Sequence, residues 1–237
     1  MKKFIAAGLA LCMAFMLAAC GGSPSSTASQ AGSGTSAAAD GSAVTIKLGG
    51  IGPITGSTAV YGEAVMNGAQ IAVDEINASD SAVKFEYNFQ DDEGDAETAV
   101  NAYNILKDWG MQVLMGTVTT APCLAVISET EADNMFQITP SASSTDVIVP
   151  DNVFQVCFTD PNQGVSAADY IADNGLATKV AAIYDSSDAY SSGIYNAFAA
   201  EAEAKGLEIV CAEAFTADNK TDFRTQLQKA QSAGADL

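Results

Sequence analysis

Residues 46–78 decide the fold, and they read IKLGGIGPITGSTAVYGEAVMNGAQIAVDEINA. A short apolar run ends in glycine-rich turns, and a long pattern with helical periodicity follows. This order predicts a strand, a tight turn and a helix, which is the opening unit of an α/β sheet. The turn at 52–56 is then expected at the carboxyl end of the strand, where open α/β sheets bind ligands. The residues on one face of the expected helix are Val65, Ala69, Ala72, Val73 and Ile76.

Strand-like and helix-like segments alternate along the rest of the chain. Asp95 is expected as the N-cap of one of the helices, because it directly precedes a helical pattern. Repeated βα winding of this kind predicts a mostly parallel sheet with flanking helices. The expected strands are 44–51, 83–90, 111–116, 135–139, 153–158, 179–184 and 207–215, and the expected helices are 61–77, 96–109, 122–133, 163–174, 190–205 and 221–233.

The wording of residues 51–62, IGPITGSTAVYG, and the DEIN at 74–77 resemble the first segment of the periplasmic leucine/isoleucine/valine-binding proteins. These proteins are the solute receptors of ABC importers. The resemblance implies an α/β fold of two lobes, the type I periplasmic-binding-protein fold, with each lobe a mostly parallel sheet flanked by helices. We therefore expect a first ligand-binding lobe over 44–152 and an incomplete second lobe over 153–237, with the ligand held between them. Family members are longer, so the resemblance also implies that the C-terminal part of the fold is missing.

The start of the chain has the pattern of a bacterial lipoprotein leader. Two lysines precede an apolar run over 4–19, which is short for a membrane span and typical of a signal peptide. The run ends in LAAC, with Cys20 as its last residue, and this pattern resembles a lipobox. We expect a signal peptide at 1–19, a lipid-modified Cys20, and a flexible linker within 20–43 that is rich in Gly, Ser and Ala. An ordinary signal peptide that happens to carry a cysteine is the alternative.

The charge balance of the chain argues against two classes of partner. The chain has 29 acidic and 10 basic residues, and its formal net charge is −19. Removing the two leader lysines leaves 8 basic against 29 acidic residues, a net charge of −21. Nucleic acids and anionic lipid surfaces are therefore not expected as partners, and membrane contact is expected through the lipid anchor only.

The sequence contains few residues that bind metals or act as nucleophiles. It has no histidine, and its cysteines outside the leader are Cys123, Cys157 and Cys211. We expect these three as buried free thiols, while a Cys157–Cys211 bridge stays open. Neither a zinc site nor a cofactor is expected. The acidic run at 91–95 does not have the spacing of a calcium-binding EF-hand loop and is expected to be a solvated turn.

Two serine- and threonine-rich segments follow expected strand ends. The segment at 116–122, GTVTTAP, offers hydroxyls and free backbone N–H groups just before a helix, which suits a carboxylate. Plain helix capping by Thr120 is the alternative. The segment at 138–144, ITPSASS, resembles the family's loop that grips the amino acid. The resemblance makes Thr120, Ser141 and Ser143 the groups that bind the ligand carboxylate.

An acid and two tyrosines complete the expected ligand site. Asp160 precedes a proline that begins a helix, where an N-cap would stabilise the helix by about 1 kcal/mol. The resemblance implies instead that this acid meets the ligand ammonium, and both roles are compatible. Tyr61 and Tyr190 lie at the start of corresponding helices, where family members place aromatic residues against the ligand side chain. The alternative is that each tyrosine packs against its own lobe.

The leading functional hypothesis is an extracytoplasmic receptor. It would be a lipid-anchored monomer that delivers an amino acid, of the branched-chain type, to the permease of an ABC importer. A ligand-sensing ectodomain of the same fold, or a receptor for amides, urea or aromatic acids, are the alternatives. An extracytoplasmic hydrolase is disfavoured, because the chain lacks histidine and any GxSxG or HExxH motif.

Overall fold

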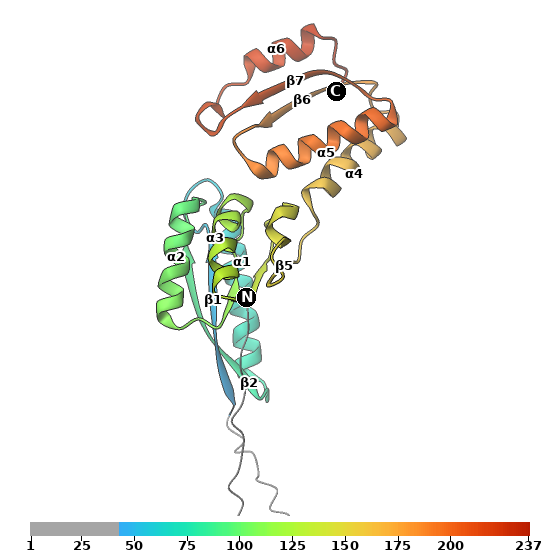
Figure 1. The fold of residues 1–237 in the computed structure, drawn as a ribbon. Coiled ribbons are helices and arrows are strands. Elements are labelled where there is room, and N and C mark those ends of the chain that lie inside the picture. Colours follow the sequence, from blue (N-terminus) through green and yellow to red (C-terminus); the bar gives the residue numbers. More distant parts are fainter. Residues whose placement is uncertain (1–42) are drawn as a thin grey trace, which may run out of the picture. The chain divides into compact units, whose positions relative to one another are not determined.

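The computed structural model describes residues 43–237 (Figure 1). The expected signal peptide, Cys20 and all of the linker except its last residue lie outside this range. Strands and helices alternate in the described part, as predicted. The strands are β1 (Val44–Gly52), β2 (Val83–Asp91), β3 (Val113–Met115), β4 (Gln137–Thr139), β5 (Val153–Gln155), β6 (Lys179–Asp185) and β7 (Glu208–Phe215). The helices are α1 (Ala59–Ala78), α2 (Ala96–Trp109), α3 (Thr120–Ala132), α4 (Asp160–Asp173), α5 (Ala189–Lys205) and α6 (Arg224–Ser232), with short 3₁₀ turns η1 (Thr145–Ile148) and η2 (Ala217–Asn219).

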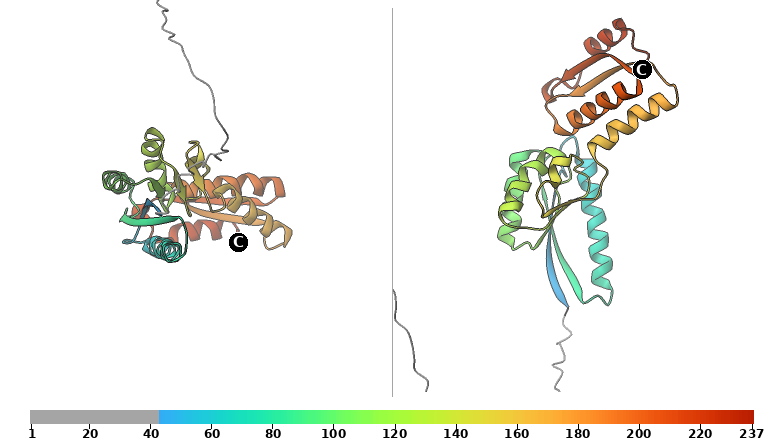
Figure 2. Two further views of the ribbon diagram at one scale, coloured as in Figure 1. Left: turned by 90° about the horizontal axis from the view of Figure 1, so that it is seen from below. Right: turned by 45° about the vertical axis from the view of Figure 1, so that its right-hand side comes forward.

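The first sheet has the strand order β2-β1-β3-β4-β5, and all of its pairs are parallel. Helix α1 covers one face, and α2 and α3 pack together on the other face (Figures 1 and 2). The core of this part lies between the sheet and the pair α2/α3, because its fully buried members come from both. They include Ile51, Tyr103, Leu106, Leu114 and Val126.

The second sheet consists of the parallel pair β6 and β7. Helices α4 and α5 lie on one side of it and α6 on the other (Figure 1). Gly164 allows α4 to approach α5 closely, since a Cβ there would come within 2.4 Å of the Ile194 carbonyl oxygen. At the chain's end, the Ala181 N–H of β6 donates to the Leu237 carbonyl oxygen at 2.8 Å.

The prediction for the first helix is confirmed in its position and wrong for one member of its buried face. Val73 is buried and Val65, Ala69 and Ile76 are half-buried, whereas Ala72 is exposed. The buried stripe runs through Gly62 and Val73, and Ala72 lies on its margin. The helix N-cap predicted at Asp95 is confirmed, because its side chain accepts the Thr98 N–H.

Strand β5 is shorter than predicted and belongs to the first sheet. It pairs with β4 in the register Gln137↔Val153 and Thr139↔Gln155. The expected boundary between residues 152 and 153 assigned this strand to the second lobe, and that assignment is wrong. The chain leaves the first sheet only after Gln155, because β5 needs β4 to pair its backbone groups. The division into two lobes itself stays a prediction.

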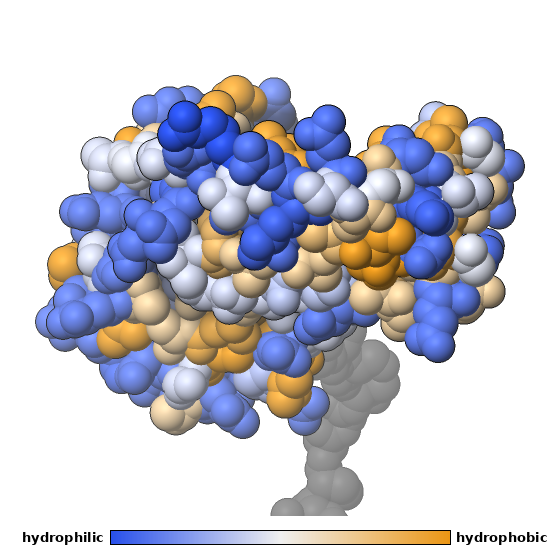
Figure 3. All heavy atoms as spheres, turned by 90° about the horizontal axis from the view of Figure 1, so that it is seen from above, coloured by the Kyte–Doolittle hydropathy of each residue, from blue (hydrophilic) through white to orange (hydrophobic). Residues whose placement is uncertain are grey.

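The surface of the described chain is mixed in character. Figure 3 shows one face, on which hydrophobic residues form small patches among hydrophilic ones. Several exposed hydrophobic side chains lie on β5 and the residues after it, including Phe154, Val156 and Phe158. No helix within residues 43–237 combines the length and the apolar character that a membrane crossing requires.

The three cysteines of the described chain are free. Cys123 is buried, as expected, and burial raises the pKa of its thiol to about 11. Cys157 and Cys211 are only half-buried, so the expectation of full burial is wrong for them. The Cys157–Cys211 bridge, which the sequence left open, is not formed.

Candidate functional site

The loop after β3 brings Thr120 to the start of α3. The helix begins at Thr120, two residues before the predicted start, and Thr119 is its N-cap. Thr120 therefore lies inside the first helical turn, so the alternative that it only caps the helix is wrong. Its side chain is buried, and its hydroxyl accepts the Ser143 N–H at 3.3 Å. The first N–H groups of a helix have no partner within it, so this end offers donors to an anion.

The loop after β4 carries Ser141 and Ser143 beside the start of α3. The Ser141 hydroxyl donates to the Val118 carbonyl oxygen at 2.6 Å, so its only proton is already used. Ser143 is buried, and its carbonyl oxygen accepts the Asp160 N–H at 2.9 Å. Thr120, Ser143 and Asp160 are thus linked through consecutive hydrogen bonds.

Asp160 is a buried acid with an unsatisfied oxygen. It is the first residue of α4, and Thr159 occupies the N-cap position, so the alternative that Asp160 is only the helix N-cap is wrong. Its side chain is 1% exposed. Its Oδ1 accepts the Gln163 side-chain amide at 3.4 Å, whereas Oδ2 has no partner among the described residues.

The electrostatic surroundings of Asp160 favour a cationic partner. Burial raises the pKa of the Asp160 carboxyl, and the charge of Asp188 adds to this, while the Ser143 hydroxyl beside it opposes the shift. No lysine or arginine in residues 43–237 forms an ion pair with Asp160. A ligand ammonium at Oδ2 would supply both the missing hydrogen bond and the missing positive charge.

The two tyrosines are placed differently. Tyr190 lies in the first turn of α5 and is 41% exposed, and its hydroxyl donates to the Gln163 side-chain oxygen at 3.3 Å. Burial raises the pKa of Tyr190, and the nearby Asp160 and Tyr61 raise it further. Tyr61, in the first turn of α1, is 61% exposed. Tyr190 therefore belongs to the Asp160 cluster through Gln163, whereas Tyr61 is mostly exposed and its hydroxyl bonds none of the described residues.

Gln163 was not singled out from the sequence, although it bonds both Asp160 and Tyr190. Its spacing of three residues from Asp160 places both side chains on one face of α4, which is the signal that could have found it. Residues i and i+3 are neighbours on a helix.

The acidic residues at the end of β2 and just after it bind the loop that precedes α1 and lie partly buried. The Asp91 carboxylate accepts the Ile54 N–H at 2.9 Å and the Thr55 hydroxyl at 2.6 Å. Asp92, however, is fully buried, so the expectation of a solvated turn is wrong for this residue. Burial raises its pKa to about 6, and the charges of Asp91 and Asp95 add to the effect of burial.

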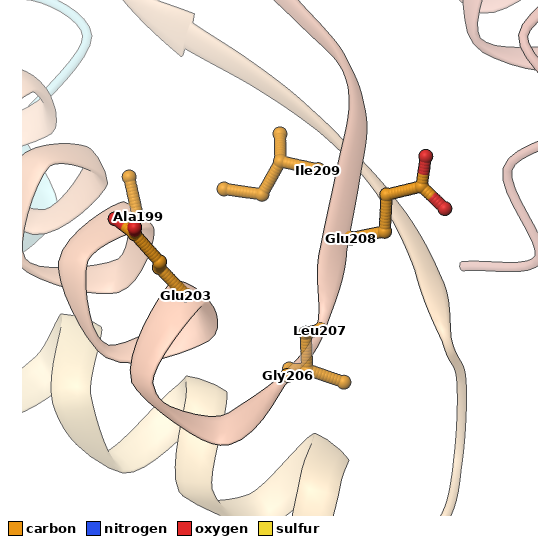
Figure 4. Close-up of a pocket in the computed structure, with 6 residues that line it drawn as sticks. All are labelled: Ala199, Glu203, Gly206, Leu207, Glu208 and Ile209. Atoms are coloured by element: carbon orange, nitrogen blue, oxygen red, sulfur yellow. The ribbon is translucent and has the colours of Figure 1, made fainter.

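A shallow depression of about 420 Å³ lies at the other end of the second sheet, between the end of α5 and the start of β7. Figure 4 shows Ile209 pointing toward α5 and Glu208 pointing to the other side of the strand. The depression lies at the amino end of β7, away from the strand ends that carry Asp160 and Tyr190. Within the described chain, no group of three His, Cys, Asp or Glu side chains is arranged to hold a metal ion.

Comparisons with known proteins agree with this fold. The family model of periplasmic binding proteins matches residues 45–237. Leu/Ile/Val-binding protein homolog 3 of Brucella melitensis is 33% identical over 196 residues, which are 81% of this chain and 53% of that protein. The chain spans about half the length of the curated relatives that it matches.

Solved structures show the same architecture. The leucine binding protein LivK of Thermotoga maritima has a TM-score of 0.74 and 27% identity, over 80% of this chain and 54% of that one. A second similar structure is that of LivJ, the branched-chain amino acid transporter substrate binding protein of Streptococcus pneumoniae, solved in complex with isoleucine. It has a TM-score of 0.72 and 30% identity, and the match covers 79% of this chain and 54% of that one. This chain therefore belongs to the family of periplasmic binding proteins and has the α/β fold of its type I members.

Proposed function

We propose that this protein is the extracytoplasmic receptor of an ABC importer and that it binds a small amino acid of the branched-chain type. The observation that carries the proposal is the buried Asp160, whose Oδ2 lacks a partner and whose surroundings lack a cation. An ionised carboxylate in this position is costly unless it is paired. A ligand ammonium satisfies it, and that pairing would lower the pKa of Asp160.

The opposite end of an amino acid needs hydrogen-bond donors. The start of α3 supplies them, because its first N–H groups are free of helical partners and Thr120 adds a hydroxyl. Ser143 connects this helix end to Asp160 by hydrogen bonds through its N–H and its carbonyl. Donors for a carboxylate therefore lie beside an acceptor for an ammonium, which suits a zwitterion. Tyr61 and Tyr190 are proposed to line the side-chain end of the ligand, and Ser141 to contribute through its backbone.

The rest of the proposal concerns location and partners. We infer that Cys20 is lipid-modified after removal of residues 1–19 and that the protein is held at the outer face of the membrane as a monomer. Its partners are the amino acid and the importer's permease. The relatives support the ligand class by their names: Leu/Ile/Val-binding in Brucella melitensis, and a complex with isoleucine in Streptococcus pneumoniae. We do not assign it a catalytic activity.

The test compares leucine with 4-methylpentanoate, which has the same side chain and carboxylate but lacks the amine. Asp160→Asn in the full-length protein keeps the shape of the side chain and removes its charge. Losing one partner of a buried charge pair costs about 2–5 kcal/mol, so leucine affinity should fall about 30-fold to several thousand-fold. Affinity for 4-methylpentanoate should not fall. Titration calorimetry measures both.

Asp173→Asn is the matched control, because Asp173 ends the same helix and its side chain is 67% exposed. This variant should bind leucine like the wild type. If Asp160→Asn lowers the affinity for leucine and for 4-methylpentanoate equally and only slightly, Asp160 does not bind the ammonium. If the wild type prefers the acid without the amine, the solute is not an amino acid and an aromatic or aliphatic acid becomes the better assignment.

A further inference from the structure

The strands β3 and β4 stop pairing through their backbones just before the candidate site. Their register pairs Leu114 with Gln137 and Met115 with Ile138. The last backbone hydrogen bond between them runs from the Gly116 N–H to the Ile138 carbonyl oxygen at 2.9 Å. We call residues 116–120 the first segment and residues 137–143 the second segment. Beyond the Gly116–Ile138 bond, these two segments carry the residues proposed to bind the ligand carboxylate. Something other than backbone pairing must hold them together.

Three side chains of the second segment continue the pairing. The Gln137 amide donates to the Gly116 carbonyl oxygen at 2.8 Å, and the Thr139 hydroxyl donates to the Thr117 carbonyl oxygen at 2.7 Å. The Ser141 hydroxyl donates to the Val118 carbonyl oxygen at 2.6 Å. Every second residue thus bonds successive carbonyls of the first segment. We call these three contacts the side-chain ladder.

Two rungs of the ladder share a face through strand geometry. Residues i and i+2 of a strand point to the same face of the sheet, so Gln137 and Thr139 of β4 lie on one face, and Ser141 adds the third contact from the bend after the strand. Gln137 and Thr139 are fully buried and cannot touch a ligand. Thr139 also accepts the Ala142 N–H at 3.0 Å, so one hydroxyl ties its own loop to the preceding one.

The ladder determines where the N–H groups of the first segment point. In a trans peptide the N–H points opposite to the C=O of the same peptide unit. Holding the carbonyls of Thr117 and Val118 against the second segment turns the N–H groups of Val118 and Thr119 away from it. Neither N–H has a hydrogen-bond partner among the described residues. Val118 is fully buried, so of these two donors only the N–H of the half-buried Thr119 can reach a ligand, next to the free N–H groups at the start of α3.

We propose that Gln137, Thr139 and Ser141 are positioning residues, whose ladder holds segment 116–120 so that the N–H of Thr119 and the free N–H groups at the start of α3 face the ligand carboxylate. This inference rests on the proposed function for the identity of the ligand group. Ser141, which the sequence assigned to the carboxylate itself, acts with its hydroxyl through Val118 instead. Thr139 is the central rung, because its hydroxyl both donates to the Thr117 carbonyl oxygen of the first segment and accepts the Ala142 N–H of its own loop.

The experiment removes the central hydroxyl while keeping its shape. Thr139→Val in the full-length protein is compared with Thr139→Ser, which restores the hydroxyl. Thr98→Val is the control, since Thr98 is a half-buried threonine of α2 whose hydroxyl bonds only Asp95 at the start of the same helix. Two properties are measured: leucine affinity, and amide hydrogen exchange at Gly116 and Ser143 in the ligand-free protein. Both N–H groups bond across the two segments without using the Thr139 side chain.

Thr139→Val should weaken leucine binding about tenfold and speed exchange at both amides about tenfold, as expected from lost buried hydrogen bonds. Thr139→Ser should return both properties to near the wild-type values, and Thr98→Val should leave both unchanged. Equal exchange in Thr139→Val and Thr98→Val would overturn the ladder. So would a Thr139→Ser variant that behaves like Thr139→Val, because the methyl group would then be responsible.

Ser141→Ala provides a second variant at a more exposed rung if Thr139→Val fails to fold. It should also speed exchange at Gly116 and Ser143, and wild-type exchange there would overturn the ladder. If the wild-type protein does not bind leucine, the proposed ligand class fails, while the exchange comparison in the ligand-free protein still decides the ladder.

Discussion

Replacing Asp92 by asparagine is expected to stabilise the protein at neutral pH and to destabilise it at acidic pH. Asp92 follows β2 directly and is fully buried. Its Oδ1 accepts the Gly94 N–H at 2.9 Å, and its Oδ2 has no partner among the described residues. Burial, with the charges of Asp91 and Asp95, raises its pKa from 3.8 to about 6.

The magnitude follows from this rise in pKa, which corresponds to about 3 kcal/mol. Between pH 3.8 and about 6 the folded state binds more protons at Asp92 than the unfolded state does. The free energy of unfolding contributed by this group therefore falls as the pH rises through that window. Asp92→Asn removes the titration and keeps the acceptor for Gly94, but its NH₂ group lacks a partner. We expect a gain of about 1–2 kcal/mol at pH 8, after this unsatisfied donor is counted.

The assay is urea unfolding of wild type and variant from pH 8 to pH 4, followed by fluorescence of the single tryptophan, Trp109. The difference between the two proteins should change by about 2.4 kcal/mol over this range and reverse its sign. Taking the difference cancels the titration of groups that do not interact with Asp92. A difference that is the same at pH 8 and pH 4 would refute the reasoning, because Asp92 would then titrate alike in the folded and unfolded states.

Asp91→Asn is the matched control with the opposite sign. The partial burial of Asp91 is outweighed by hydrogen bonds from the Thr55 hydroxyl and from the N–H groups of Glu93 and Ile54, so its pKa is lowered. Its contribution to stability is present above the ordinary pKa of a free aspartate and is lost as the pH falls through the lowered value. The Asp91→Asn variant should therefore be less stable than the wild type at pH 8 and approach it in acid.

Two further predictions concern the first helix and the leader. A Cβ at Gly62 would lie 1.7 Å from the Pro53 carbonyl oxygen, so Gly62→Ala should cost about 1–3 kcal/mol in urea unfolding. Gly68→Ala, on the same helix with open space around it, should raise the free energy of unfolding by about 0.5–1 kcal/mol. Equal changes in the two variants would show that Gly62 is not required by the close approach of Pro53. Cys20→Ala in the native host should move the protein out of the detergent phase, whereas unchanged membrane retention would argue against a lipid anchor.

Local signals in the sequence determined the order of the elements and the clearest boundaries. Helix α2 begins and ends where predicted, because Asp95 caps it and Gly110 closes it in a left-handed conformation. Both signals act within a few residues of the helix end. The starts of α3 and α4 were placed too late, because the helices begin before Pro122 and Pro161, which occupy their first turns.

The candidate site was predicted by residue type, and its arrangement was decided by the tertiary structure. Thr120, Ser143 and Asp160 were chosen from the sequence, and the fold links them by hydrogen bonds. Gln163 could have been found from its helical spacing, whereas the buried state of Asp92 could not. Burial depends on which distant residues cover a side chain, and no local pattern contains that information.

The same reason explains the placement of β5 and the side-chain ladder. Strand β5 pairs with β4, which lies more than a dozen residues earlier in the chain. The residues of β5 alone do not indicate which of the two sheets the strand joins. The ladder needs Gln137, Thr139 and Ser141 to meet carbonyls more than twenty residues earlier in the chain. The sequence by itself determined the strands, helices and turns, since caps, glycines and periodicity act between near neighbours. Only the tertiary structure decided which polar groups are buried, paired or left free for a ligand, because that depends on contacts between segments far apart in the chain.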